Sequence, residues 1–300
     1  MIKITIGVAN SGKSTWAHQE WNKDPENTII INRDKIRELL FSYTERSVYD
    51  YYKRSDFNKL EKRVTKYEDT LIYEALSNNK KVIVDATHLK KEYITRFEYW
   101  NVSLELVWFD ITLKEALTRN ISRDRKVSED IIKKQYNRYV DLRKNFSSYS
   151  FNPKSFKQNK NLPPCIIYDI DGTISKMKGR SPYDWDKVDE DFVISNVVTT
   201  IDWLADLSIL NRPKVILCTG RDGKALDKTK QWLLSNSIYA DKLYIRTEGD
   251  NRPDWIVKEE MWEEIASENY IVGMYDDRLQ VVRRARALGL KVFNVEYNNF

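Results

Sequence analysis

Short runs of apolar residues, each followed by a polar or glycine-containing turn, recur along the first half of the chain. Four of them predict buried strands at residues 2–6, 28–31, 81–85 and 104–109. Helix-forming stretches separate these strands, and the first is expected to run from Lys13 until Pro25 stops it. This alternation of strand and helix predicts a parallel α/β sheet.

The pattern is interrupted once and then resumes. Residues 145–164 lose the apolar periodicity and collect Ser, Asn, Lys and Pro, which is typical of a linker. Buried strands are predicted again at residues 165–168, 214–219 and 270–275. We therefore predict two α/β domains, at residues 1–147 and 164–300, joined by a linker at 148–163.

Composition narrows the class of protein. The 300 residues are 41% hydrophobic and 32% charged, and no apolar run approaches the roughly 18 residues of a membrane span. The first residues lack the long apolar region of a signal peptide. Both cysteines, Cys165 and Cys218, lie in apolar runs. We expect a soluble cytoplasmic protein with reduced, buried thiols.

Charge is divided unevenly along the chain. Residues 1–160 carry 31 Lys and Arg against 22 Asp and Glu, while the remainder carries 19 against 23, giving the net charge of +5. A basic first half suits a polyanionic partner such as nucleic acid, and a well-solvated surface explains it as well. The same two explanations hold for residues 42–79, where tyrosines are interleaved with Lys and Arg.

The first predicted strand leads directly into GVANSGKST, which fits the phosphate-binding pattern G-x-x-x-x-G-K-[ST]. Gly7 and Gly12 permit a turn whose backbone N–H groups converge on phosphate oxygens, and the following helix adds its positive end. Lys13 is expected to reach the β- and γ-phosphates of ATP and Ser14 to ligate Mg²⁺, with Thr15 completing the nucleotide-binding set. The alternative is a chance glycine-rich turn, which would not require the complete motif after a strand.

Polar residues also follow the later strands of the first half. Asp34 and Arg37 share a helix face, so that the carboxylate can accept the proton of an attacking hydroxyl and the guanidinium can bind a phosphate on the acceptor. A capping Asp beside a solvated Arg is the alternative. Asp85 fits Mg²⁺ support, acceptor orientation or capping equally well. Arg119 and Arg123 are expected on one face of a helix beginning near residue 114, where they can neutralise a transferring phosphoryl group.

The second half begins with the pattern D-x-D-G-T. Asp169 and Asp171 leave a strand end on the same side, so that one carboxylate can attack phosphorus while the other manages protons, with Mg²⁺ screening their repulsion. Gly172 permits the tight turn, and Thr173 can hold a phosphate oxygen. Supporting groups follow on later strands and a helix: Thr219, Arg221, Lys258, Asp276 and Asp277. A lone D-x-D pattern also fits a turn, and these later groups argue against that alternative.

Together these motifs resemble known families. The second half has the signature of haloacid-dehalogenase-type phosphohydrolases, and the phosphate loop with NRDxxR and paired arginines extends the resemblance, almost over the full length, to the polynucleotide kinase-phosphatases of T-even bacteriophages. GRSPYD, VKEE and DDR, which lie outside the generic motifs, also resemble that family. The resemblance implies a P-loop kinase sheet followed by a haloacid-dehalogenase-like Rossmannoid sheet. It also implies ATP and Mg²⁺, transfer of the γ-phosphate to 5′-OH ends, and removal of 3′-phosphates or 2′,3′-cyclic phosphates.

The resemblance assigns roles to the candidate residues. In the kinase it implies Asp34 as general base, Arg37 as the clamp on an acceptor 3′ phosphate, and Arg119 and Arg123 as lid groups on the donor. In the phosphatase it implies Asp169 as nucleophile, Asp171 as general acid/base, and Thr219 and Lys258 on the phosphate. It places Arg180 and Arg221 on the substrate, with Asp254 as a further candidate there. Mg²⁺ would be held by Asp169, Asp171, Asp276 and Asp277. The chain departs from the family at Asn10, where many phosphate loops have glycine, and at Asp124-Arg125 after the paired arginines. These departures could alter lid affinity.

The resemblance also implies partners. Single-stranded RNA or DNA ends are the expected substrates, with a ligase acting in cooperation, a homotetramer as the expected assembly and the host-cell cytoplasm as the location. Two rival hypotheses stay open: a small-molecule kinase fused to a small-molecule phosphatase, and an RNA-repair adaptor with inactive sites. The basic first half and GRSPYD argue against the first, and the filled catalytic positions argue against the second. The choice between RNA and DNA and the nucleotide donor are not decided by the sequence.

Overall fold

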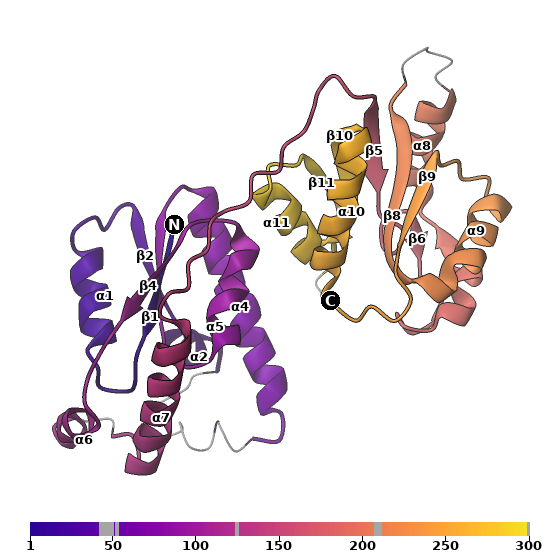
Figure 1. The fold of residues 1–300 in the computed structure, drawn as a ribbon. Helices are drawn as coiled ribbons and strands as arrows, with labels where there is room; N and C mark the ends of the chain where they lie inside the picture. Colours follow the sequence, from indigo (N-terminus) through magenta and orange to yellow (C-terminus); the bar gives the residue numbers. More distant parts are fainter. Residues whose placement is uncertain (42–50, 52–53, 124–125, 207–211, 299–300) are drawn as a thin grey trace. The chain divides into compact units, whose positions relative to one another are not determined.

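The computed structural model describes residues 1–41, 51, 54–123, 126–206 and 212–298. The chain divides into two compact units, Met1–Pro153 and Lys154–Phe300, and each contains a parallel sheet between helices (Figure 1). This confirms the two-part α/β fold class expected from the sequence. Asp124, Arg125 and most of residues 42–53, for which the sequence raised expectations, lie outside the described residues.

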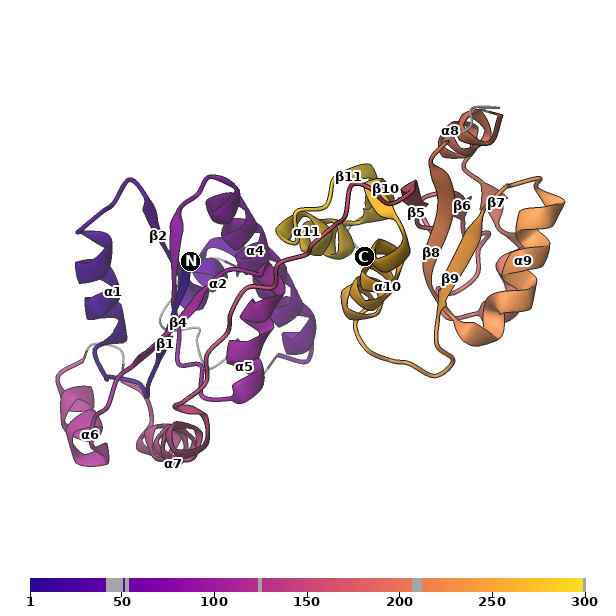
Figure 2. The same cartoon turned by 45° about the horizontal axis from the view of Figure 1, so that its top comes forward.

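The sheet of the first unit has four parallel strands in the order β2-β3-β1-β4. Their bounds are β1 Ile2–Ile6, β2 Thr28–Asn32, β3 Lys81–Asp85 and β4 Leu104–Trp108. Helix α1 (Lys13–Trp21) covers one face and α4 (Phe57–Ser77) the other, as both views show (Figures 1 and 2). Burial on both faces explains why the strands are rich in Ile and Val.

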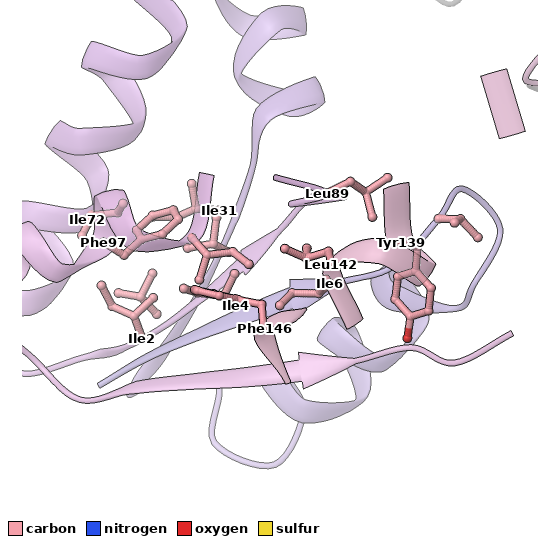
Figure 3. Close-up of a cluster of buried hydrophobic side chains, with 14 of the residues drawn as sticks. Ile2, Ile4, Ile6, Ile31, Ile72, Leu89, Phe97, Tyr139, Leu142 and Phe146 are labelled. Carbon is pink, nitrogen blue, oxygen red and sulfur yellow. The ribbon is translucent and has the colours of Figure 1, made fainter. Parts of the chain in front are cut away.

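A single core holds the first unit together. Ile2, Ile4 and Ile6 of β1 are fully buried, and Leu142 and Phe146 of helix α7 belong to the same cluster (Figure 3). The other helical segments are α2 Arg33–Phe41, α5 Lys91–Thr95, the 3₁₀ turn η2 Arg96–Trp100, α6 Leu113–Ile121 and α7 Glu129–Phe146. Because β1 lies inside the sheet, its carboxyl end delivers the phosphate loop to the middle of the edge where ligands of parallel sheets bind.

One sequence expectation about this unit is wrong. Helix α6 ends at Ile121, so Arg123 does not share a helix face with Arg119. The reason is local: the side chain of Asn120 accepts the N–H of Val127 at 3.0 Å and donates to its carbonyl at 2.7 Å. These bonds hold Val127 beside Asn120, one residue before the end of α6, and Ser122 caps the helix.

The second unit contains a five-stranded parallel sheet in the order β11-β10-β5-β8-β9. The strand bounds are β5 Pro164–Tyr168, β8 Lys214–Asp222, β9 Lys242–Arg246, β10 Tyr270–Arg278 and β11 Val292–Asn298. Side chains alternate between the faces. Cys165 and Ile167 of β5 belong to the core under α10 (Asp254–Glu268) and α11 (Leu279–Ala287). Tyr168 belongs to the core under α8 (Ser195–Asp206) and α9 (Leu226–Ser235). This alternation is the period of two that strands impose.

Helical segments and one pair of short antiparallel strands complete the second unit (Figure 2). They are β6 Ser175–Lys176, η3 Trp185–Glu190, β7 Phe192–Val193, α8 Ser195–Asp206, η4 Gly223–Ala225, α9 Leu226–Ser235, α10 Asp254–Glu268 and α11 Leu279–Ala287. Cys165 and Cys218 are buried and unpaired, as expected. Across the described ranges, no helix has the length and apolar character needed to cross a membrane.

Candidate active sites

The phosphate loop of the first unit is folded around the ammonium of Lys13. Gly12 has φ of 94°, a left-handed conformation that glycine adopts without strain. Lys13 Nζ donates to the carbonyl of Val8 at 2.6 Å and to Ser11 Oγ at 3.3 Å. Burial lowers the pKa of Lys13 to about 8. The motif therefore forms a compact loop with its lysine inside, and Thr15 lies exposed on the following helix.

Ser14 and Asp85 meet at the carboxyl edge of the sheet. Ser14 Oγ donates to Asp85 Oδ2 at 2.7 Å, and Asn32 Nδ2 donates to the same oxygen at 2.9 Å. A hydroxyl beside a buried carboxylate offers the oxygen ligands that Mg²⁺ prefers, either directly or through water. The N-terminus of α2 is capped by Asn32, whose Oδ1 accepts the N–H of Asp34 at 2.9 Å. The capping alternative for Asp34 is therefore not supported.

Asp34 and Arg37 are in contact, as their spacing predicts. Arg37 Nη1 donates to Asp34 Oδ1 at 2.7 Å, and the other side of the guanidinium donates to Glu61 at 2.8 and 2.9 Å. Tyr51 Oη also donates to Glu61, at 2.7 Å. The Asp34 side chain keeps 46% of its surface exposed. The result is an accessible carboxylate oriented by a buried arginine, which suits a base that acts on a large acceptor.

Two arginines approach the loop from the segment after β4. Arg119 Nη1 donates to the carbonyl of Asn10 at 3.3 Å, and Arg123 Nη1 donates to Asn10 Oδ1 at 2.7 Å. Both arginine side chains are solvent-exposed. Although α6 ends before Arg123, the structure brings both predicted arginines to the phosphate loop.

The centre of the second unit is a buried row of opposite charges. Lys258 Nζ of α10 donates to Asp169 Oδ1 and to Asp276 Oδ2, each at 2.8 Å. Burial raises the pKa of Asp169 to about 7 and that of Asp276 to about 6, against the opposing effect of Lys258. Burial opposes charge on Lys258 as well, but its carboxylate neighbours raise the pKa of this lysine well above its usual value.

Three carboxylates converge at this centre. Ligand oxygens of Asp169, Asp276 and Asp277 lie within 4.8 Å of one another. Gly172 has φ of 86°, and a Cβ at this position would lie 2.2 Å from Asp277 Oδ2, so only glycine lets Asp277 approach. Three carboxylate oxygens in reach of one point fit Mg²⁺, a hard cation that takes oxygen ligands.

Asp171 belongs to a neighbouring cluster of arginines. Arg221 donates to both Asp171 oxygens at 2.8 Å through Nε and Nη2, and Arg180 Nη2 donates to Oδ1 at 2.8 Å. Asp191 accepts from both arginines, at 2.6 and 3.0 Å. Burial opposes ionisation of Asp171, but Arg221 and Arg180 lower its pKa. The side chain of Asp171 is thus held by arginines rather than by the three-carboxylate group.

Further predicted residues line the same region. The Oγ1 of Thr219 accepts the N–H of Arg221 at 3.2 Å. Asp254 lies beside Lys258, with its Oδ2 3.7 Å from Nζ. The buried hydroxyl of Thr173 has no hydrogen-bond partner within the part of the chain that the structure describes. Thr173 follows Gly172, which lies against Asp277, so its unpartnered hydroxyl is a candidate hydrogen-bond donor to a phosphate oxygen.

Sequence reasoning missed Glu61 and Asp191, the acidic partners of the predicted arginines. Glu61 is one of several acids on the charged helix α4, and Asp191 ends the acid-rich run 184–191. Nothing in either local pattern distinguishes them from solvated acids. The signal that could have found them is the need of a buried arginine for an acidic partner, since buried charges are normally paired.

The two sites define a class of protein. A phosphate loop with an accessible carboxylate beside it, and a buried Asp–Lys–Asp centre with a third carboxylate, are the arrangements that phosphoryl-transfer chemistry needs. Residues 163–300 match the phosphatase-domain family of polynucleotide kinase PNKP, and residues 2–144 match an AAA-domain family. The two matches fall on the two units separately, and together they confirm the resemblance to polynucleotide kinase-phosphatases stated from the sequence.

Similar proteins include a viral one and several solved structures. A protein of Autographa californica nuclear polyhedrosis virus, named "Putative bifunctional polynucleotide kinase/RNA ligase", is 28% identical over 97% of this chain. This chain spans only 42% of the length of that relative. A chain in a Pnkp1/Rnl/Hen1 RNA repair complex is 26% identical, with a TM-score of 0.47 over 100% of this chain and 96% of that one. A deoxyadenosine kinase from M. mycoides is 16% identical, with a TM-score of 0.33 over 51% of this chain and 88% of that one.

Proposed function

We propose that this protein repairs nucleic-acid ends by two reactions. The first unit transfers the γ-phosphate of ATP to a 5′-OH end of RNA or DNA. The second removes a 3′-phosphate, or opens and removes a 2′,3′-cyclic phosphate, through an aspartyl-phosphate. The observation that carries this proposal is the match of residues 163–300, which span the carboxylate centre, to the phosphatase-domain family of polynucleotide kinase PNKP.

The proposed kinase reaction follows from the residues at the loop. The 5′ oxygen attacks the γ-phosphorus while Asp34 takes its proton, and the bond from the γ-phosphorus to the bridging oxygen breaks to release ADP. Lys13 and the loop N–H groups hold the donor phosphates. Arg119 and Arg123 offset the charge that develops on the transferring group. Arg37 orients Asp34 and binds a phosphate on the acceptor strand.

The proposed phosphatase reaction uses two carboxylates in sequence. Asp169 attacks phosphorus and the P–O3′ bond breaks while Asp171 gives its proton to O3′, which leaves a 3′-OH end and a phosphoryl group on Asp169. Water then attacks that phosphorus, and Asp171, oriented by Arg180 and Arg221, takes a proton from the water. The P–O bond to Asp169 breaks, which releases inorganic phosphate and restores the Asp169 carboxylate. Lys258 and the hydroxyls of Thr173 and Thr219 would hold the phosphate oxygens, as the resemblance implies for Lys258 and Thr219.

Mg²⁺ is the metal that the donor sets suit. In the second unit Asp169, Asp276 and Asp277 would hold it, and in the first unit Ser14, supported by Asp85, would hold it. When bound, the ion stabilises negative charge on phosphate oxygens. The protein residues supply the remaining functions of each site: binding, orientation and proton transfer.

A direct assay tests the proposal. The protein is incubated with Mg²⁺, γ-labelled ATP and a 5′-OH oligonucleotide, and separately with an oligonucleotide that ends in a 3′-phosphate. We expect label on the 5′ end in the first reaction and inorganic phosphate in the second. Transfer to nucleosides or sugars but not to oligonucleotides would contradict the proposal and favour the small-molecule kinase. Inactivity in both assays would favour the adaptor.

The products suggest the partner. A 5′-phosphate and a 3′-OH are the ends that a nucleic-acid ligase joins, so we propose that a ligase acts after this enzyme. The name of the viral relative, a putative bifunctional polynucleotide kinase/RNA ligase, supports this pairing of activities. We expect a homo-oligomer, which light scattering of the purified protein would test.

A further inference from the structure

Asn10, which stands where many phosphate loops have glycine, makes contacts that a glycine could not. Its Nδ2 donates to the carbonyl of Ala116 at 3.2 Å and to Asn120 Oδ1 at 3.1 Å, both on α6. Its Oδ1 accepts from Arg123 Nη1 at 2.7 Å. One loop side chain therefore contacts both the helix after β4 and the arginine beyond that helix.

Asn120 connects these contacts to the segment that carries Arg123. It is buried, with 7% of its surface exposed, and its side chain bonds both the N–H and the carbonyl of Val127. Arg123 lies in the sequence between Asn120 and Val127. The same Asn120 oxygen that accepts from Val127 also accepts from Asn10, so one buried side chain bonds both the phosphate loop and Val127.

Backbone geometry alone does not explain an asparagine at this position. Asn10 has φ of 66°, and glycine adopts this conformation with less strain than any other residue. What glycine lacks is the side-chain amide, with its two donated bonds and its one accepted bond. The contacts made by the amide are therefore the reason to look for a role.

We propose that Asn10 is a positioning residue of the kinase, which holds Arg123 at the phosphate loop before the donor binds. An arginine that is already oriented loses less conformational freedom when it engages the transferring phosphate. Asn10 should therefore affect the rate of transfer more than the affinity for ATP. The inference rests on the proposed kinase function, which supplies the 5′-OH acceptor. The contacts of Asn10 at the phosphate loop, where ATP would bind, come from the structure.

The test uses Asn10→Gly, which keeps the backbone conformation and removes only the amide. We expect the turnover rate of the kinase at saturating ATP and oligonucleotide to fall at least about tenfold, as for a lost hydrogen bond to a charged group. The KM for ATP should change by less than about threefold. Asn79→Gly is the matched control, since Asn79 also has a positive φ, 57°, but lies exposed after α4. Release of 3′-phosphate by the second unit and ATP-dependent thermal stabilisation show that each variant is folded.

A double-mutant cycle separates positioning from general support of the loop. In an Arg123→Ala background, Asn10→Gly should cause little further loss of turnover rate, because its effect passes through that arginine. An unchanged turnover rate in Asn10→Gly, a loss confined to the KM for ATP, or fully additive losses in the double variant would each overturn the proposal.

The proposal that the acceptor is a 5′-OH end can fail independently of the proposal about Asn10. If the wild-type protein phosphorylates no 5′-OH oligonucleotide, the proposed function is wrong, and ATP hydrolysis by the same proteins then tests Asn10 alone. Slower hydrolysis in Asn10→Gly, with no further loss in the double variant, would support positioning. Equal hydrolysis in the wild type and Asn10→Gly would overturn it.

Discussion

Two buried lysines show how much a residue depends on its neighbours. Lys13 and Lys258 are both buried, yet burial lowers the pKa of the first to about 8, while carboxylates raise that of the second despite its burial. Lys258 has Asp169 and Asp276 within 2.8 Å, whereas Lys13 bonds a carbonyl and a hydroxyl. Lys258 is thus neutralised within the protein, and Lys13 is left with its charge available to a phosphate.

Reciprocal substitutions should separate the two activities. Lys13→Ala removes the cation of the phosphate loop and should abolish 5′ phosphorylation, with 3′-phosphate release near the wild-type rate. Asp169→Asn cannot form an acyl-phosphate and should have the opposite effect. Both rates are measured on one oligonucleotide carrying a 5′-OH and a 3′-phosphate. Loss of both activities in either folded variant would contradict the assignment of one site to each unit.

His88 should make the first unit sensitive to acid. It is buried, its Nδ1 lies 2.8 Å from the carbonyl of Thr5, and burial lowers its pKa to about 4, with Arg33 and Arg96 acting in the same direction and Glu68 opposing them. The unfolded chain binds this proton near pH 6.5. The contribution of neutral His88 to the free energy of unfolding is therefore fully present above about pH 6.5. It is lost as the pH drops toward 4, and about 2 kcal/mol of it is lost at pH 5.

His88→Asn tests this pH dependence, since Asn tolerates the φ of 45° at this position and does not titrate. The free energy of unfolding of the first unit is measured at pH 7.5 and pH 5 in urea. The wild type should lose about 2 kcal/mol more than His88→Asn. His18→Asn, a change at an exposed histidine, is the matched control. Identical losses in wild type and His88→Asn would rule out the buried histidine as the source.

At the level of elements, α10 (Asp254–Glu268) contributes to both the proposed phosphatase site and the core. It presents Lys258 to the carboxylates and, one turn later, buries Trp262 completely. The Trp262 Nε1 has no hydrogen-bond partner among the residues that the structure places. The tryptophan therefore contributes through packing and burial rather than through its N–H group.

Substitutions at Trp262 should follow the apolar area removed. Trp262→Ala should lower the free energy of unfolding of the second unit by about 3–5 kcal/mol. Trp262→Phe should cost much less, because it keeps most of the ring and removes the unpartnered N–H. Urea unfolding of the second unit measures both, with Trp203→Ala as control because Trp203 is 69% exposed. A phenylalanine variant as unstable as the alanine variant would point to an essential N–H contact.

Predictability from sequence also differs between elements. The strands and the phosphate loop could be predicted because their patterns are local: apolar runs at a strand period, followed by glycines at fixed spacing. The end of α6 could not, since it depends on the bond between Asn120 and Val127 rather than on periodicity. Asp191 was missed for the same reason, because its role depends on the arginines that the fold places beside it.

For the whole molecule, charge distinguishes the two halves. Residues 1–160 hold the excess of basic residues and the remainder an excess of acidic ones. If the first unit contacts several phosphates of the acceptor strand, its KM should rise steeply with salt, with a log–log slope of about 0.7 per phosphate for single strands. The phosphatase KM for the same strand should rise less. Nucleoside 3′-phosphate is the small acceptor for comparison, and equal salt slopes for both activities would contradict this prediction.

The positions of the two cysteines give the second unit a reporter of its own opening. Cys165 and Cys218 lie on the neighbouring strands β5 and β8, at most 1% exposed, and burial raises the pKa of the Cys165 thiol to about 12. A thiol reagent can reach them only when this sheet separates, and the chain contains no other cysteine. The rate of thiol labelling therefore measures how often the sheet behind the phosphatase centre opens, with no contribution from the kinase half.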